Sequence, residues 1–184
     1  DVVTPMFDVI APRYDAFTRL FSFGMDATWK RYLIASVTAH ASQAQRALDL
    51  ACGTGDLGFA LAAQLPALNV TGVDPSSEML TIARTRISTA ERPRVTFELG
   101  AMGALPAASA SVDLITAGYG FRNVPDLDAA VRECARVLRP GGVLGSLDFF
   151  VPRNALWRAL FLGYLRVSGD IVGWWWHRTP AIYG

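Results

Sequence analysis

Cysteine, histidine and an excess of charge of one sign are all scarce in this 184-residue chain. Its two cysteines, Cys52 and Cys134, lie far apart without a CxxC or Cys/His spacing, which argues against a disulfide framework and a structural zinc site. The 17 basic and 16 acidic residues give a net charge of only +1, which excludes the basic surface typical of a nucleic-acid-binding protein. We therefore expect a reducing compartment, no bound metal and no nucleic-acid partner.

Long uninterrupted hydrophobic runs are also missing. The most apolar stretch, residues 154–176, is interrupted by Arg158, Arg166 and Asp170, which argues against a lipid-spanning helix. No basic start is followed by an apolar segment, so no secretory signal is predicted. We expect a cytoplasmic protein. Because the chain starts without Met and ends without a helix stop or a final strand, we also expect it to be part of a longer protein.

Hydrophobic residues nevertheless make up 52% of the chain, enough for one globular domain with a core of its own. Short apolar runs predict strands at 46–51, 69–73, 95–99, 112–117 and 143–149. Helical periodicity predicts helices at 5–36, with a break at Ser22-Phe23-Gly24, and at 56–65, 75–87 and after Asp126, the last one stopped by Pro140-Gly141-Gly142. This alternation favours a doubly wound parallel α/β sheet that binds ligands at the carboxyl ends of its strands.

A glycine-rich segment, Gly53-Thr54-Gly55-Asp56-Leu57-Gly58, follows the first predicted strand and matches GxGxxG. A dinucleotide oxidoreductase is therefore the first hypothesis. However, Asp56 lies in the first helical turn, where it would repel a pyrophosphate but tolerate a ligand that carries an ammonium or sulfonium charge. Asp49, just before the loop, could accept hydrogen bonds from the loop or from a ligand's ammonium group.

A second acid, Asp74, ends the second predicted strand. A carboxylate there can accept charge-assisted hydrogen bonds from both hydroxyls of a ribose. NAD and S-adenosylmethionine share that ribose, so Asp74 does not discriminate between them. The structural alternative is a turn or cap acid before Pro75.

Two sets of motifs carry a family resemblance. Segments 48–55, 72–75 and 138–142 resemble the class I S-adenosylmethionine-dependent methyltransferases. Segments 7–15, 22–26 with Trp29, and 120–124 resemble more narrowly the ubiquinone/menaquinone biosynthesis C-methyltransferases. The resemblance implies a Rossmann-like, mainly parallel sheet of order 3-2-1-4-5 within a single methyltransferase domain, residues 1–184. It comprises an N-terminal helical lid (1–40), a cofactor-binding core (45–150) and an apolar helical segment (151–184), with closing strands 6 and 7 absent from this chain.

The same resemblance implies S-adenosylmethionine as cofactor. The resemblance assigns cofactor contacts to Thr54, Asp74, Ala101, Met102 and Gly118. Together with the acid before the loop, the loop glycines and the residue after Asp74, the predicted cofactor-binding set is Asp49, Gly53, Thr54, Gly55, Asp74, Pro75, Ala101, Met102 and Gly118. Ala101 departs from the family, which commonly has Asp or Asn there, so that only backbone groups remain to contact the adenine amino group. Thr18 likewise replaces a usual Asn, and Asp148 a common Glu.

Methylation of an aromatic carbon requires a ring hydroxyl to become a phenolate, although a phenol has a pKa of about 10. We assign Arg122 to stabilise that anion, because its guanidinium stays protonated. The structural alternative is an ion pair of Arg122 with Asp126 or Asp15. Asn123 could orient a water molecule or a ring oxygen.

Two further residues complete the predicted catalytic set. Asp148 is the most plausible carboxylate to accept a proton. Tyr14, from the N-terminal lid, could close the cavity, with plain helix packing as its alternative interpretation.

The expected function is C-methylation of a reduced, lipid-like polyprenyl benzoquinol or naphthoquinol. An O- or N-methyltransferase of small molecules and a non-catalytic methyltransferase-fold subunit of a biosynthetic complex are the alternatives. The apolar end of the chain, with Trp174-Trp175-Trp176, has two interpretations. It packs on the core or on a second subunit, or it forms a surface that binds the polyprenyl tail or contacts the membrane interface. Besides the quinol substrate, we therefore expect two possible partners: the inner membrane face, through peripheral contact, and a second copy of the chain in a homodimer.

Overall fold

The computed structural model describes residues 22, 24–89, 91–149 and 154–172. The chain divides into two compact units, Asp1–Asp148 and Phe149–Gly184, which are described separately. The predicted lid residues Tyr14, Asp15 and Thr18 lie outside the described residues, as do the three tryptophans 174–176.

The first unit is built on one parallel sheet, with strands in the order β3-β2-β1-β4-β5. This order and this strand direction are those predicted. The strands are β1 (Arg46–Leu50), β2 (Asn69–Asp74), β3 (Val95–Leu99), β4 (Val112–Gly118) and β5 (Leu138–Leu147), so the first four differ from the predicted ranges by at most one residue.

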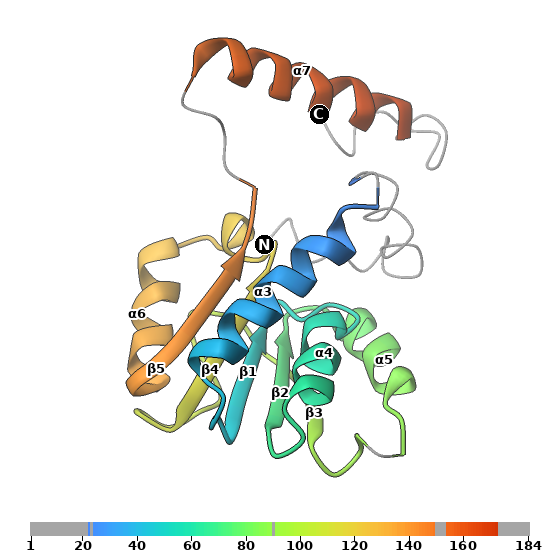
Figure 1. Ribbon diagram of the computed structural model, residues 1–184. Helices are drawn as coiled ribbons and strands as arrows, with labels where there is room; N and C mark the ends of the chain where they lie inside the picture. Colours follow the sequence, from blue (N-terminus) through green and yellow to red (C-terminus); the bar gives the residue numbers. More distant parts are fainter. Residues whose placement is uncertain (1–21, 23, 90, 150–153, 173–184) are drawn as a thin grey trace. The chain divides into compact units, whose positions relative to one another are not determined.

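Helices cover both faces of this sheet. The helices of the first unit are α3 (Asp26–His40), α4 (Asp56–Gln64), α5 (Ser77–Arg86) and α6 (Leu127–Val137), with a short 3₁₀ helix η2 (Phe121–Asn123). Figure 1 shows α3 and α4 in front of the strands. One apolar core joins α3, α4 and α5 to the sheet, and a second core joins α6 to its opposite face. The side chains of β1 divide between these two cores, with Ala47 in the first and Leu48 and Leu50 in the second, as the twofold periodicity of a strand requires.

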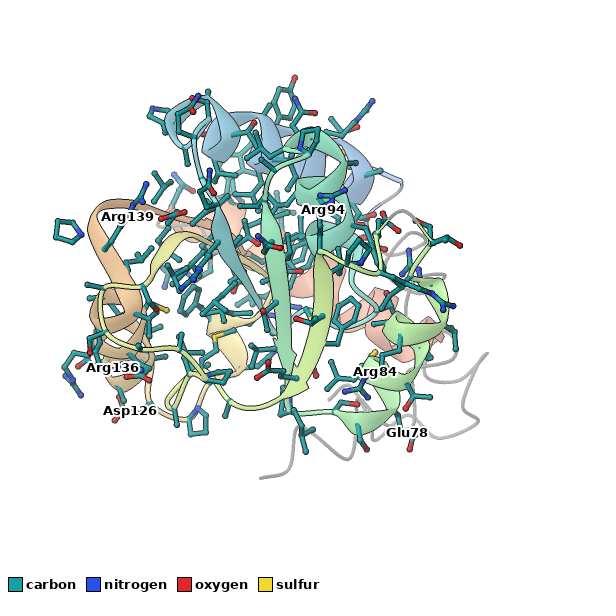
Figure 2. All side chains as sticks on the ribbon, turned by 90° about the horizontal axis from the view of Figure 1, so that it is seen from below. Glu78, Arg84, Arg94, Asp126, Arg136 and Arg139 are labelled. Atoms are coloured by element: carbon teal, nitrogen blue, oxygen red, sulfur yellow. The ribbon has the colours of Figure 1, made fainter. Side chains whose placement is uncertain are left out.

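Most charged side chains of this unit lie at its rim, whereas Asp26, Asp49, Asp74 and Asp113 are buried. Seen from below (Figure 2), Glu78 and Arg84 on α5, and Arg136 on α6 with its N-cap Asp126, lie around a centre filled by carbon-rich side chains. Two of these helices have the N-caps that a short polar residue before a helix predicts. Ser76 Oγ accepts a hydrogen bond from Met79 N, and Asp126 Oδ1 accepts one from Ala129 N.

The largest boundary errors concern the strand predicted at 143–149, which as β5 begins at Leu138 and ends at Leu147, and the ends of two predicted helices. Helix α6 ends at Val137, and the Pro140-Gly141-Gly142 segment expected to stop it lies inside β5. Gly141 has φ +81°, a left-handed conformation that glycine adopts without a steric penalty, and the β4–β5 pairing shifts register at this place. The predicted first helix resumes after its expected break, but as α3 it continues past Ser36 to His40.

The second unit contains α7 (Ala155–Val172), within the segment predicted to be helical. Asn154 Oδ1 caps it by accepting hydrogen bonds from the backbone N–H groups of Leu156 (3.0 Å) and Trp157 (3.2 Å). Among the helices described, none combines the length and apolarity that a membrane crossing would need.

Candidate functional site

A cavity of about 360 Å³ opens at the carboxyl ends of β1, β2, β3 and β4, where a doubly wound sheet is expected to bind ligands. One side is formed by segments 51–55 and 73–76, which we call the β1–β2 wall and in which Ala51, Gly53, Val73, Asp74 and Pro75 line the cavity. Another side is formed by segment 118–126, the β4 wall, in which all residues except Phe121 and Arg122 line the cavity. The predicted site residues that line the cavity are Gly53, Asp74, Pro75, Ala101, Met102, Gly118 and Asn123.

The glycine loop makes a tight turn in the β1–β2 wall. Gly53 and Gly55 have φ values of +53° and +91°, which L side chains rarely adopt. A Cβ at Gly53 would meet nothing within 4 Å, so open space lies in front of its backbone. A Cβ at Gly55 would lie 2.8 Å from atoms of both Phe59 and Phe97. Gly53 thus admits a ligand to the loop, whereas Gly55 lets the loop pack on the core.

Asp74 fixes this loop from the neighbouring strand. Its carboxylate accepts hydrogen bonds from Gly53 N (2.8 Å) and from Ser76 N (2.9 Å), and the residue is only 7% exposed. Asp74 therefore fulfils the alternative role of a turn acid, and it also lines the cavity. Both roles can coexist because each oxygen of a carboxylate can accept more than one hydrogen bond.

Asp49 lies fully buried beneath the loop rather than in the cavity lining. Its carboxylate accepts from Gly58 N and from Thr116 Oγ1, each at 2.9 Å, and so ties β1 to α4 and β4. Burial raises the pKa of Asp49 to about 7, against the opposing effect of these two hydrogen bonds. Asp49 was predicted to accept hydrogen bonds from the loop or from a ligand's ammonium group; the observed backbone donor is Gly58, the last residue of the glycine-rich segment, in the first turn of α4.

Thr54 and Asp56 do not belong to the described cavity lining. Arg86 donates to the Thr54 carbonyl at 2.8 Å and pairs with Asp56 at 2.7 Å, and Lys30 of α3 pairs with Asp56 at 2.9 Å. Burial acts to raise the pKa of Asp56, but the two cations outweigh it and hold that pKa below its usual value. Because two cations balance its charge, Asp56 does not select the ligand by repelling a pyrophosphate, and that argument from the sequence is wrong.

The third edge of the cavity follows β3. Gly100 N donates to the Asp74 carbonyl at 3.0 Å, which closes the turn onto β2, and Ala101 and Ala104 form an isolated antiparallel bridge. Ala101 is exposed and Met102 is buried in the second core. This edge therefore offers a ligand backbone groups and an apolar thioether side chain.

The β4 wall contains a strained residue that the sequence analysis missed. Tyr119 has φ +58°, a conformation that costs a non-glycine residue on the order of 1–3 kcal/mol. Its hydroxyl donates to Asp26 Oδ1 on α3 at 2.8 Å, and its N–H donates to the Leu147 carbonyl of β5 at 2.7 Å. No local signal in the sequence predicts this conformation, because it depends on partners on two other elements.

Arg122 and Asp148 form an ion pair at the carboxyl ends of β4 and β5. The guanidinium lies 3.5 Å from Asp148 Oδ1, and the Arg122 backbone N–H donates to Asp148 Oδ2 at 3.1 Å. The Arg122 side chain is 42% exposed and that of Asp148 only 5%, and neither residue belongs to the cavity lining described here. The suggested pairing of Arg122 with Asp126 is wrong, since Asp126 caps α6.

Asn123 is the predicted catalytic residue that lines the cavity itself. Its amide donates to the Tyr119 carbonyl at 3.1 Å, which orients the side chain within the turn of η2. Residues that sequence reasoning did not assign to the site complete the lining, among them Ala51, Met79, Asp126 and Ala130. Among the residues that the structure describes, no group of three or more His, Cys, Asp and Glu side chains could hold a metal ion.

Comparison with known proteins finds a family model and relatives that match most of this chain. Residues 1–171 match the ubiE/COQ5 methyltransferase family. A protein of Geotalea uraniireducens named ubiquinone/menaquinone biosynthesis C-methyltransferase UbiE is 35% identical over 173 residues, which are 93% of this chain and 73% of the relative. The demethylmenaquinone methyltransferase of Deinococcus radiodurans is 39% identical over 164 residues, 89% of this chain and 67% of the relative.

Solved structures agree with the fold. The YcgJ protein of Bacillus subtilis is 28% identical, with a TM-score of 0.62 over 76% of this chain and 59% of that one, so the chain spans about three fifths of it. A putative S-adenosylmethionine-dependent methyltransferase of Methanococcus maripaludis, 22% identical, reaches a TM-score of 0.69 over 89% of this chain and 73% of that one.

Proposed function

The chain belongs to the ubiE/COQ5 family of S-adenosylmethionine-dependent methyltransferases, and from this premise we propose that it methylates a ring carbon of a reduced, polyprenyl-bearing quinol. One observation carries the proposal: Asn123 lines the same cavity as Asp74, and Arg122, the partner of Asp148, lies over the ring of Tyr119, which also lines that cavity. The groups suited to bind a nucleoside and the groups suited to stabilise a phenolate thus meet at one edge of the sheet.

The residues of the β1–β2 wall fit S-adenosylmethionine. The carboxylate of Asp74 suits the two ribose hydroxyls, and the open space before Gly53 leaves the loop backbone accessible. Val73, Met79 and Met102 provide apolar surface for a purine ring, with backbone groups at Ala101 for its polar edge. When bound, the cofactor supplies an electrophilic methyl group and departs as a neutral thioether.

The remaining chemistry falls to the β4 wall. Asp148 accepts the proton of a ring hydroxyl, and the permanently charged Arg122 stabilises the phenolate that forms. The electron-rich ring carbon takes up the methyl group and then loses its own proton to water, which Asn123 helps to orient. Asp148 returns its proton to the ring oxygen, so that the product is a quinol and the carboxylate is regenerated. A quinone has no ionisable hydroxyl and is an electrophile, so the acceptor must be the reduced quinol.

Product analysis tests this proposal. The purified protein is incubated with isotopically labelled methyl donor and a panel of quinols and quinones, with and without dithionite, and the products are identified by mass spectrometry. We expect a methyl group on carbon, with the quinols as substrates directly and with the quinones only when dithionite reduces them. A methyl group on oxygen or nitrogen would replace the proposal by an O- or N-methyltransferase. Cofactor binding without any product would support a non-catalytic subunit.

A polyprenyl quinol resides in the bilayer, and we propose that the chain meets it by peripheral contact with the inner membrane face. Leu156, Trp157 and Leu160 near the start of α7, with Arg158 among them, support this assignment because tryptophan and basic residues favour the interface. Flotation with vesicles of phosphatidylglycerol and phosphatidylethanolamine tests it. We expect the wild type to float and the Leu156→Asp/Leu160→Asp protein to stay in solution; a wild type that stays in solution would contradict the assignment. A homodimer remains a prediction.

A further inference from the structure

Tyr119 touches both the predicted catalytic cation and helix α3. The Arg122 guanidinium makes a cation–π contact with its ring, with Cζ 5.4 Å from the ring centroid. Its hydroxyl donates to Asp26 Oδ1 at 2.8 Å, and the residue is only 5% exposed. Non-glycine residues stay in the left-handed conformation only where their surroundings hold them, and such residues concentrate at functional sites.

The anchor of the Tyr119 hydroxyl is itself firmly held. Lys30 Nζ lies 2.8 Å from Asp26 Oδ2, and the backbone N–H of Asp26 donates to Ser22 Oγ at 3.2 Å. Burial acts to lower the pKa of Lys30, but hydrogen bonds and charge from Asp26 and Asp56 outweigh it and raise that pKa. Lys30 therefore remains a cation, and Asp26 stays fixed as an acceptor for Tyr119.

The same lysine leads to the glycine loop. Lys30 Nζ also lies 2.9 Å from Asp56 Oδ2, Asp56 Oδ1 lies 2.7 Å from Arg86, and Arg86 donates to the Thr54 carbonyl at 2.8 Å. The charges alternate along this line and balance, two acids against two bases. We call this line, from Asp26 through Lys30 and Asp56 to Arg86, the α3 ion-pair chain. It connects the β4 wall to the β1–β2 wall, although none of its members belongs to the described cavity lining.

We propose that Tyr119 is a positioning residue: it sets the place of the Arg122 guanidinium and is held there by the α3 ion-pair chain. This inference rests on the proposed function, because it gives Arg122 a part in methyl transfer. According to this inference, α3 affects the rate of methyl transfer although it contacts neither the cofactor nor the quinol. A misplacement of a charged group by about 1 Å can cost on the order of a hundredfold in rate, so one lost hydroxyl is sufficient to test the inference.

Tyr119→Phe keeps the ring and removes only the anchoring hydroxyl. We expect kcat with a reduced quinol to fall by about tenfold to a hundredfold, while the Kd of S-adenosylmethionine changes by less than about twofold. Lys30→Met should lower kcat similarly, and Lys30→Arg should restore part of the loss. The double variant Tyr119→Phe/Lys30→Met should be little worse than either single variant, because both break one line of contacts.

Arg31→Met is the matched control. Arg31 is the neighbouring cation on α3, but it is exposed and donates to Thr28 Oγ1 at 3.0 Å, away from the α3 ion-pair chain. We expect it to leave kcat unchanged. A Tyr119→Phe protein with a lowered melting temperature and an unchanged kcat would overturn the inference and leave Tyr119 as a core residue.

A spectroscopic measurement separates this inference from the proposed function. In protein labelled with ¹⁵N-arginine, the side-chain signal of Arg122, assigned by its loss in Arg122→Gln, should carry a ring-current shift from Tyr119. Tyr119→Phe should change that shift even if no quinol proves to be a substrate. An unchanged Arg122 signal would overturn the inference, whatever the wild-type activity.

Discussion

The two walls of the cavity are held in different ways. In the β1–β2 wall, the buried carboxylate of Asp74 accepts hydrogen bonds from the backbone N–H groups of Gly53 and Ser76. Outside this wall, the buried Asp49 accepts in the same way from Gly58 N and so ties β1 to α4. The β4 wall also has backbone hydrogen bonds, but two contacts between side chains tie it to other elements: the Tyr119 hydroxyl donates to Asp26 of α3, and Arg122 pairs with Asp148 after β5.

The way in which each wall is held suits its proposed role in binding or in catalysis. The β1–β2 wall depends on buried carboxylates that bind its own backbone N–H groups, which suits the binding of one invariant cofactor. A wall held by side chains from α3 and β5 can be altered by single substitutions. We therefore expect changes in the β4 wall to act on kcat and changes in the β1–β2 wall to act on cofactor affinity and stability.

The largest effect should come from Arg122→Gln. If Arg122 stabilises the developing phenolate, kcat should fall by roughly a hundredfold to a thousandfold, the range for loss of one oxyanion donor, while the Kd of S-adenosylmethionine stays nearly constant. Lys at this position should restore part of kcat, because it returns the charge without the planar fork. Initial rates with a reduced quinol measure this. An unchanged kcat would leave Arg122 as a structural partner of Asp148.

Asp74→Ala tests the opposite wall. We expect cofactor affinity to fall by roughly tenfold to a hundredfold, since hydrogen bonds to a charged group contribute about 1.5 to 3 kcal/mol. Because Asp74 also holds Gly53 and Ser76, the melting temperature should fall as well. Isothermal titration calorimetry with S-adenosylmethionine measures the affinity.

Asp74→Asn is the control for that experiment, because its amide oxygen can still accept one backbone hydrogen bond. If Asp74→Asn restores the melting temperature but not the affinity, the carboxylate binds the cofactor directly. Full affinity in both variants would reduce Asp74 to a turn residue.

Asp49→Asn should change how stability depends on pH. The folded protein keeps the Asp49 proton up to a pKa of about 7, whereas the unfolded chain releases it near the ordinary value for Asp. Stability from this group is therefore fully present below about pH 4 and is lost as the pH rises towards about 7. Chemical denaturation at several pH values measures this loss, which should be about 2 kcal/mol between about pH 5 and about pH 7.

An asparagine at position 49 does not titrate, and Thr116 can accept from its amide while Gly58 N still finds the amide oxygen. The wild type should therefore lose stability relative to Asp49→Asn across this range. Parallel pH profiles of the two proteins would show that Asp49 does not hold its proton.

The smallest effects are expected at the two helix caps. Ser76→Ala and Asp126→Ala should each cost about 1 kcal/mol in the free energy of unfolding. Ser76 should cost more, because it is 1% exposed and its loss leaves the Met79 N–H unpaired in the interior, whereas water can reach the end of α6 beside exposed Asp126. Urea denaturation measures both. Equal costs would contradict the importance of burial here.

Much of this protein follows from the sequence alone. The five strands, their parallel direction, the glycine loop and the acid at the end of β2 were predicted and are confirmed. These features depend on residues close together in the chain: apolar runs, a glycine spacing, a polar cap before a helix. The strand order was implied by the family resemblance, and both the order and the family are confirmed. Their physical causes, strand and helix periodicity and backbone sterics, are local, so neighbouring residues suffice to indicate them.

Only the tertiary structure decided which side chains meet. Asp56 pairs with Lys30 and Arg86, 26 and 30 residues away, and Tyr119 donates to Asp26, 93 residues away. Such contacts depend on how α3 and α5 are placed on the sheet, and the identity of a residue does not encode that placement. For the same reason the sequence suggested a ligand-selecting role for Asp56 and did not predict the strained backbone of Tyr119, both of which are fixed by partners on distant elements.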